Sequence, residues 1–70
     1  MSDLEKDIEA VKFLLGSFFG DPSEVDRQAL IRAEAAENKY VKTYADFSKE
    51  ELKGQLRILQ AQSAGSFFNF

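Results

Sequence analysis

Apolar residues recur along most of this chain at the three- and four-residue spacing of an amphipathic helix. The first stretch with this spacing contains Leu4, Ile8, Val11, Leu15 and Phe18. The second contains Val25, Ala29, Ala33, Ala36, Tyr40, Tyr44 and Phe47. The third contains Leu52, Leu56 and Leu59. We therefore predict three helices, over about residues 3–19, 22–45 and 49–63.

Polar residues at the start of each stretch support these helices. Each start has the spacing of a capping box, in which two residues three apart satisfy each other's free amides. The pairs are Ser2 with Glu5, Asp21 with Glu24, and Ser48 with Glu51. Pro22 suits the first helical position, and Phe47 with Leu52 has the spacing of a hydrophobic staple. Gly20 and Gly65 stand where the first and third helices are expected to stop.

Short links between the stretches predict the architecture. Residues 20–21 and 46–48 are too few to carry a helix far from the one before it, so neighbouring helices are expected to be antiparallel. The predicted fold class is all-α, a small three-helix antiparallel bundle. Residues 1–65 form a single helical domain in this interpretation, and residues 66–70 form an apolar C-terminal tail.

The middle stretch also allows a different fold. Ala29 to Ala36 alternates loosely, Tyr40 to Tyr44 suits a strand by propensity, and a hairpin could turn at Glu37-Asn38-Lys39. That pattern would make the protein α+β, with a helix, a β-hairpin and a second helix. Alanine, glutamate and arginine dominate residues 24–36 and prefer a helix, which favours the all-α interpretation.

The composition of the chain argues against an enzyme. Its 70 residues include no cysteine and no histidine, which excludes disulfides and the usual nitrogen and sulfur ligands of zinc, copper or iron. A serine nucleophile would lack its usual base. Paired carboxylates such as Asp3 and Asp7 lie in a predicted first helical turn, where the helix dipole already explains them. We therefore predict no catalytic residues, no metal and no cofactor.

Two further features bear on location. The first residues contain no basic segment followed by an apolar run, so no secretory signal is predicted. No stretch reaches the roughly 18 apolar residues that span a bilayer. An intracellular, cytoplasmic location without a membrane span is expected.

A basic stripe marks the third predicted helix. Lys49, Lys53 and Arg57 are spaced by four, as on one face of a helix, and such a face could contact phosphates in a small helical nucleic-acid-binding regulator. The net charge of −3 counts against nucleic acid as a partner. A solvated flank, with Lys53 near Glu50, is the favoured interpretation.

Phenylalanines give the strongest functional indication. Phe13 and Phe19 fall outside the single apolar stripe of the first helix, and Phe67, Phe68 and Phe70 follow the expected end of the third. The tail either folds back over the bundle or docks into another protein as an aromatic anchor. Seven phenylalanines exceed what so small a core can enclose. We therefore predict a non-enzymatic assembly subunit or adaptor that binds a protein partner, forms a homo-oligomer, or does both.

Residues 40–59 read YVKTYADFSKEELKGQLRIL. This segment resembles the latter half of the phage head–tail joining (head completion) proteins of the lambda W type. The resemblance implies an N-terminal helix, a β-hairpin, a second helix and an apolar tail. It also implies a structural subunit of the virion that assembles as a ring between capsid portal and tail. The sequence equally allows a phage-encoded inhibitor that blocks a host protein by occupying its surface.

Overall fold

The computed structural model describes residues 2–20 and 22–67, and the side chains of this part up to residue 65. These residues form four helices: α1 (Asp3–Gly16), α2 (Glu24–Ala35), α3 (Lys39–Tyr44) and α4 (Lys49–Phe67). The described part of the chain contains no strand. The prediction of an all-α protein is confirmed, whereas the predicted number of helices, three, is wrong.

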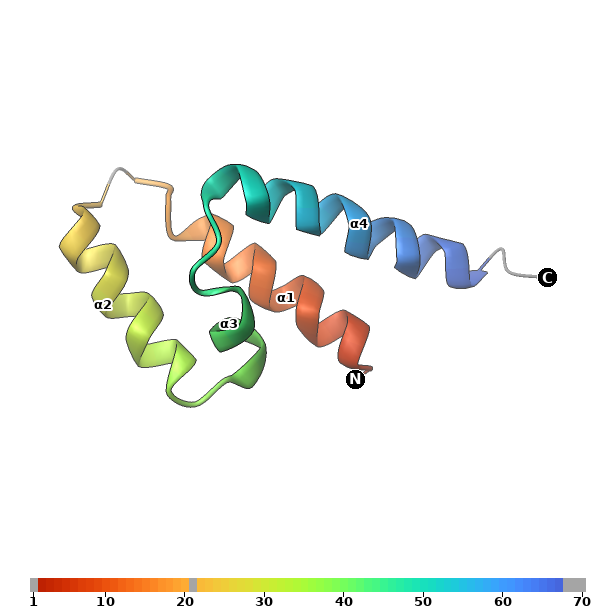
Figure 1. Ribbon diagram of the computed structural model, residues 1–70, viewed down its shortest axis with the longest axis horizontal. Helices are drawn as coiled ribbons and strands as arrows, with labels where there is room; N and C mark the ends of the chain where they lie inside the picture. Colours follow the sequence, from red (N-terminus) through yellow and green to blue (C-terminus); the bar gives the residue numbers. More distant parts are fainter. Residues whose placement is uncertain (1, 21, 68–70) are drawn as a thin grey trace.

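The long helices α1 and α4 lie side by side and run in opposite directions (Figure 1). The short helix α3 packs against α1, and α2 packs chiefly against α3 rather than along α1. In Figure 1, α2 therefore stands at one end of an elongated molecule, while the C-terminal turns of α4 extend past the start of α1 at the other. None of the helices in the described residues is both long enough and apolar enough to cross a membrane.

The expected helix over residues 22–45 is divided at residues 36–38. Asn38 causes the division, because its side-chain oxygen accepts hydrogen bonds from the backbone N–H groups of Tyr40 (3.0 Å) and Val41 (3.4 Å). Asn38 is thus the N-cap of α3, with an extended backbone that no helix interior adopts. An asparagine side chain competes with the backbone for such donors, and here it starts α3, while backbone bonds from Ala36, Glu37 and Asn38 close the end of α2.

The alternative with a β-hairpin is also wrong for the described residues. The chain does turn at residues 36–38, yet residues 39–44 form α3 instead of a strand. Packing explains the choice, because Val41 and Tyr44 are both buried in the same core. Residues three apart share a face of a helix but point to opposite faces of a strand. A strand would therefore have removed one of these two side chains from the core.

The predicted caps are confirmed at two of the three helix starts. The Ser2 hydroxyl accepts a bond from the backbone N–H of Glu5 (3.2 Å). At α4 the box is reciprocal, since Ser48 accepts from the N–H of Glu51 (3.1 Å) and Glu51 accepts from the N–H of Ser48 (3.0 Å). At α2 the cap is Ser23, which accepts from the N–H of Asp26 (3.1 Å).

The other predicted helix boundaries, a helix start at Pro22 and helix stops at Gly20 and Gly65, had different outcomes. Ser23 is the cap of α2, so Pro22 precedes that cap and is not the first helical residue. Gly20 has a φ of +82°, the left-handed conformation that suits a glycine after a helix, and it closes the turn that follows α1. Gly65 does not stop α4, which continues to Phe67. The expected boundary between a domain ending at residue 65 and a separate tail therefore falls inside a helix.

One hydrophobic core joins all four helices. Its buried members are Ala10, Val11, Leu14, Ile31, Val41, Tyr44, Leu52 and Leu59. The ring of Phe47 packs edge-on against the ring of Tyr44, with centroids 5.2 Å apart. Leu14 and Leu52 are the largest side chains that are fully enclosed, and they join α1 to α4. The core thus holds α1, α3 and α4 firmly, while α2 contributes only Ile31 to its buried part.

Candidate protein-binding surface

Two large apolar side chains, one on each side of the connection between α1 and α2, are exposed to solvent. Phe19, in the turn after α1, is 77% exposed, and Val25, in the first turn of α2, is 79% exposed. Soluble proteins bury most phenylalanines, so a ring left almost entirely in solvent is an informative exception. The structure bears out the expectation that Phe19 lies outside the core.

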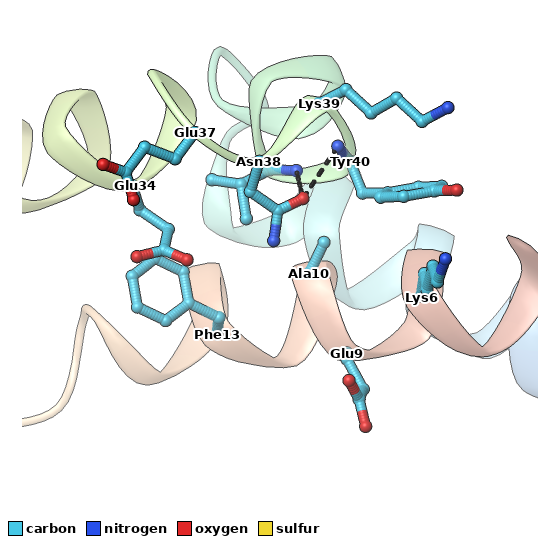
Figure 2. A pocket seen from close by; sticks show the side chains of 10 residues that line it. Lys6, Glu9, Ala10, Phe13, Glu34, Glu37, Asn38, Lys39 and Tyr40 are labelled. Carbon is cyan, nitrogen blue, oxygen red and sulfur yellow. Dashed lines mark hydrogen bonds between the residues drawn. The ribbon is translucent and has the colours of Figure 1, made fainter. Parts of the chain in front are cut away.

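Phe13 lies in a different environment from Phe19. It is half-buried against the core and lines an open groove between α1 and the turn that joins α2 to α3 (Figure 2). The two phenylalanines outside the apolar stripe of the first helix therefore differ in exposure: Phe13 packs partly against the core and Phe19 does not. Phe13 shares its groove with Glu34 of α2 and Val41 of α3, whereas Phe19 does not line it.

The groove has charged groups of opposite sign at its two ends. Ala10 of α1 and Val41 of α3, both buried, contribute to its apolar lining. Glu34 and Glu37 lie at the end where Phe13 stands, and Lys6 and Lys39 lie at the other end, beside Tyr40 (Figure 2). The arrangement suits an apolar segment that carries a base at one end and an acid at the other.

A hydrogen bond fixes Tyr40 at the basic end of the groove. Its hydroxyl donates to Oδ1 of Asp3 over 2.6 Å, and the Lys6 and Lys39 ammonium groups lie 5.7 and 5.2 Å from the centre of its ring. The bond lowers the pKa of Asp3 and, with burial as a second cause, raises the pKa of Tyr40. A raised pKa keeps the phenol protonated, which is unfavourable for a general base.

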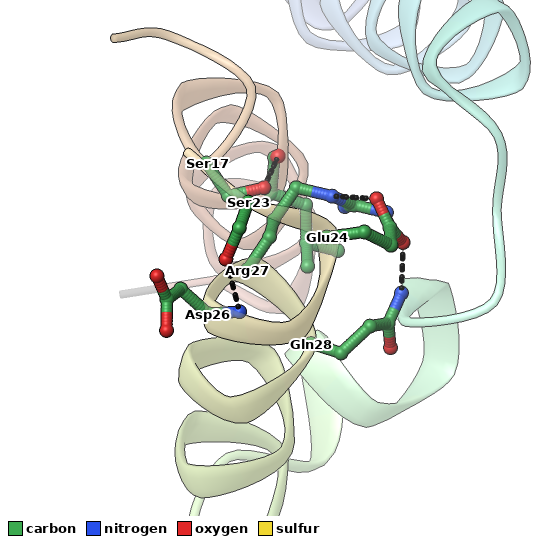
Figure 3. Close-up of polar contacts among 7 residues, drawn as sticks. Ser17, Ser23, Glu24, Asp26, Arg27 and Gln28 are labelled. Carbon is green, nitrogen blue, oxygen red and sulfur yellow. Dashed lines mark hydrogen bonds and ion pairs between the residues drawn. The ribbon is translucent and has the colours of Figure 1, made fainter. Parts of the chain in front are cut away.

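Phe18 is covered, although its neighbour Phe19 is not. The guanidinium carbon of Arg27 lies 4.1 Å from the centre of the Phe18 ring, and the Lys49 ammonium lies 5.8 Å from it. Arg27 is held in place by two bonds to the Glu24 carboxylate, at 2.9 and 3.2 Å (Figure 3). These bonds, followed by a bond from Gln28, lower the pKa of Glu24. Sequence periodicity gave no sign of this cluster, because it joins α1 to α2 across their connection.

The basic stripe of α4 lies on the surface. Lys49, Lys53 and Arg57 are all exposed, as a nucleic-acid-binding role would need. However, Lys53 is 3.7 Å from the Glu50 carboxylate, as expected for a solvated flank, and Lys49 is close to the Phe18 ring. The Glu50 carboxylate therefore offsets part of the positive charge that this stripe offers to a phosphate backbone.

The expected aromatic anchors of the tail fall largely outside the described residues. The backbone of Phe67 forms the end of α4, but its side chain, and the whole of Phe68 and Phe70, are not among them. Three exposed apolar residues were not anticipated: Leu30 on α2 (51% exposed), Ile58 on α4 (53% exposed) and Val25 on α2 (79% exposed). Val25 corrects the sequence analysis, which placed it on the apolar stripe of the second helix. Ile58 could have been found, because it falls off the stripe formed by the leucines of its own helix.

The chain was compared with protein-family models, with curated proteins and with solved structures, and none of them matches it. Within the described residues, no three aspartates or glutamates are grouped so that they could hold a metal ion. Functional assignment therefore depends on the chemistry of the surface itself.

Proposed function

We propose that this protein is a non-enzymatic interaction subunit or adaptor that binds another protein surface through Phe19. The observation that carries the proposal is the 77% exposure of this phenyl ring. Moving a phenylalanine side chain from water into an apolar environment contributes roughly 1.5–3 kcal/mol of favourable free energy. The isolated chain does not gain this free energy at position 19, whereas a complex that covers the ring does. Aromatic side chains of this kind are typical anchors of protein interfaces.

The surroundings of Phe19 support a binding role. Val25, in the first turn of α2, is a second exposed apolar side chain, and Arg27, bonded to Glu24, holds the neighbouring Phe18 ring against α2. A preorganised anchor loses little conformational entropy when it binds. We include Phe13 and its groove as a second contact, and the phenylalanines at positions 67, 68 and 70 as a third.

The titratable groups support a role other than catalysis. The shifts in the pKa of Asp3, Glu24 and Glu51 follow from hydrogen bonds at helix starts and across the surface. The pKa of Tyr44 is raised chiefly by burial, and this side chain belongs to the core. None of these groups combines a pKa near neutrality with a position in the groove, which is the usual pattern of a general acid or base.

An assembly subunit and an adaptor would both bind through an exposed phenylalanine. A structural connector of a phage particle is a more specific hypothesis of the same kind. A ring-forming connector of the virion would use the same exposed aromatics. The resemblance to head–tail joining proteins does not carry the proposal, because it implies a hairpin where residues 22–44 form α2 and α3.

A photo-reactive phenylalanine analogue at position 19 tests the proposal in cells that produce the protein. We expect a discrete cross-linked adduct from this position, and none from the same analogue at Gln60, an exposed polar position on α4. The substitution Phe19→Ser, made with the analogue at Val25, should remove the adduct formed from position 25 while leaving the helical circular dichroism unchanged. Equal, diffuse labelling from positions 19 and 60 would contradict the proposal.

A further inference from the structure

Asn38 places a hydrogen-bond donor in the groove between α1 and the turn that joins α2 to α3. Its side-chain oxygen accepts the bonds from the N–H groups of Tyr40 and Val41, which orients the amide. The NH2 group of the same amide therefore points toward α1 (Figure 2). Among the described residues, no hydrogen bond is donated by this NH2 group. A ligand in the groove thus meets a donor of fixed direction that can bond an oxygen atom.

The charged side chains at the two ends of the groove are available to a ligand. Glu34 and Glu37 lie at the end where Phe13 stands, and Lys6 and Lys39 lie at the other end (Figure 2). All four charged residues are exposed, and none of them belongs to an ion pair of the described residues. A ligand with a base at one end and an acid at the other complements both ends at once.

Neighbouring charges reduce this polarity without removing it. Asp3 lies beside the basic end through its bond to Tyr40, but two lysines face this single carboxylate. At the acidic end, Glu37 also lines a second hollow together with Arg32 and Lys42. Glu34 does not line that hollow. The basic end therefore keeps a positive charge and the acidic end a negative one.

The distance between the two ends suits a short extended segment. Lys6 and Phe13 are seven residues apart on α1, which is roughly 10 Å at a rise of about 1.5 Å per residue. The first and last of about four extended residues are separated by the same roughly 10 Å. A helix spans this distance too, but its inner carbonyl groups are already bonded within the helix. An extended segment has free carbonyl groups for the NH2 group of Asn38.

The space between the charged ends is lined by apolar side chains. Ala10 and Val41 are 3% and 1% exposed, and the small alanine leaves room for an apolar side chain of a ligand. The Phe13 ring at the acidic end offers a surface on which a cationic side chain can lie. The groove has a volume of about 780 Å³, which suits a few residues of a partner.

We propose that this groove binds a short extended segment of another protein, with a base at one end, an acid at the other and an apolar residue between them. The inference rests on the proposed interaction function and names the chemistry of the partner at its second contact. The base of the segment pairs with the two glutamates and its acid with the two lysines. One of its backbone carbonyl groups accepts a hydrogen bond from the NH2 group of Asn38.

Blocked tetrapeptides test the proposal by NMR titration of the full chain. The probes acetyl-Arg-Ala-Leu-Asp-amide and acetyl-Asp-Leu-Ala-Arg-amide carry the two charges at opposite ends, in the two chain directions. At millimolar concentration, at least one probe should shift the amide signals of Ala10, Phe13 and Val41 and leave those of α4 unchanged. The control acetyl-Leu-Arg-Asp-Ala-amide has the same composition with adjacent charges, and it should bind at least roughly threefold more weakly. Equal binding of probes and control, or no shift with either probe, would overturn the proposal.

Charge reversal at the acidic end provides a second test. Glu34→Lys should weaken binding of the preferred probe by roughly threefold to tenfold, because it replaces an attraction with a repulsion. A lysine is favourable near the end of α2, so the variant should fold, which circular dichroism checks. Asp46→Lys makes the same change in net charge at an exposed position outside the groove, and it should bind as the wild type does. Equal effects of the two variants would contradict recognition by the groove.

The donor is tested by Asn38→Asp, which keeps the oxygen that caps α3 and removes the NH2 group. Binding of the preferred probe should fall by roughly threefold to tenfold, while the midpoint of urea unfolding stays close to that of the wild type. Wild-type affinity in this variant would overturn the proposed binding of an extended backbone.

The remaining outcomes separate this inference from the proposed function. Groove signals that move with protein concentration in the absence of peptide would identify a second copy of the chain as the occupant and overturn the proposal. None of these results affects the cross-linking test at position 19, because Phe19 does not line the groove. Loss of that cross-link, with probe binding intact, would overturn the role of Phe19 and leave the assignment of the groove standing.

Discussion

The hydroxyl of Tyr40 donates a 2.6 Å hydrogen bond to Oδ1 of Asp3, and this bond ties α3 to the first turn of α1. The two residues are far apart in sequence, so the bond exists only in the folded chain. It lowers the pKa of Asp3 below its ordinary value of 3.8, and the same bond, with burial, raises the pKa of Tyr40 above 10.0. Ionised Asp3 and protonated Tyr40 are the forms that the fold favours.

The substitution Tyr40→Phe should lower the melting temperature near neutral pH by removing this bond. The pKa of Asp3 is depressed in the folded state, so the stabilisation is present above the unfolded pKa and is lost as pH falls through the folded one. The melting temperatures of Tyr40→Phe and wild type should therefore converge toward about pH 2. An NMR titration of the Asp3 carboxyl group should show its pKa rising toward 3.8 in the variant. A pH-independent difference in melting temperature would show that the loss lies elsewhere.

The substitution Asn38→Ala should destabilise the protein by about 1 kcal/mol, in the range known for N-caps. Its side chain caps α3 through the N–H groups of Tyr40 and Val41, which alanine cannot do. The control Asn38→Asp retains an acceptor oxygen and should cost much less in urea unfolding. If Asn38→Ala instead raised both stability and helicity, a continuous helix would be compatible with the core, contrary to the packing of Val41 and Tyr44.

The substitution Leu14→Ala should cost about 2–5 kcal/mol, because it leaves a cavity at the contact between α1 and α4. Leu14 is only 1% exposed, whereas Leu30, the matched control on α2, is 51% exposed. Leu30→Ala should change the free energy of unfolding by no more than about 0.5 kcal/mol at concentrations where the chain is monomeric. Similar losses for the two variants would contradict the position of the core.

The contact between Arg27 and Phe18 should be worth about 0.5–1 kcal/mol in a double-mutant cycle. The variants are Arg27→Lys, Phe18→Leu and the two together, measured by urea unfolding. Lysine keeps the charge but not the planar group that lies 4.1 Å from the ring centre. A coupling energy near zero would indicate that Arg27 stabilises α2 only through Glu24.

Local interactions made much of this fold predictable. The helix starts at Ser2 and Ser48 follow from side chains that bond to amides three residues away, and such contacts depend on neighbours in sequence alone. The break at Asn38 had a local signal as well, since the turn residues were recognised. The helical spacing of apolar residues continues from Ala36 through Tyr40 to Tyr44, and this favoured one continuous helix over a turn. Such spacing does not show where one helix ends and another begins in a new direction.

The surface was predictable only in part. The sequence by itself determined that the chain is helical, where two of its helices begin, and that its phenylalanines exceed one apolar stripe. Only the tertiary structure decided which of them are covered: Phe13 lines a groove because α2 and α3 return over it, Phe18 meets Arg27 across a connection, and Phe19 stays in water. Helix formation depends on residues a few positions apart, whereas the burial of a side chain depends on which distant segment packs over it.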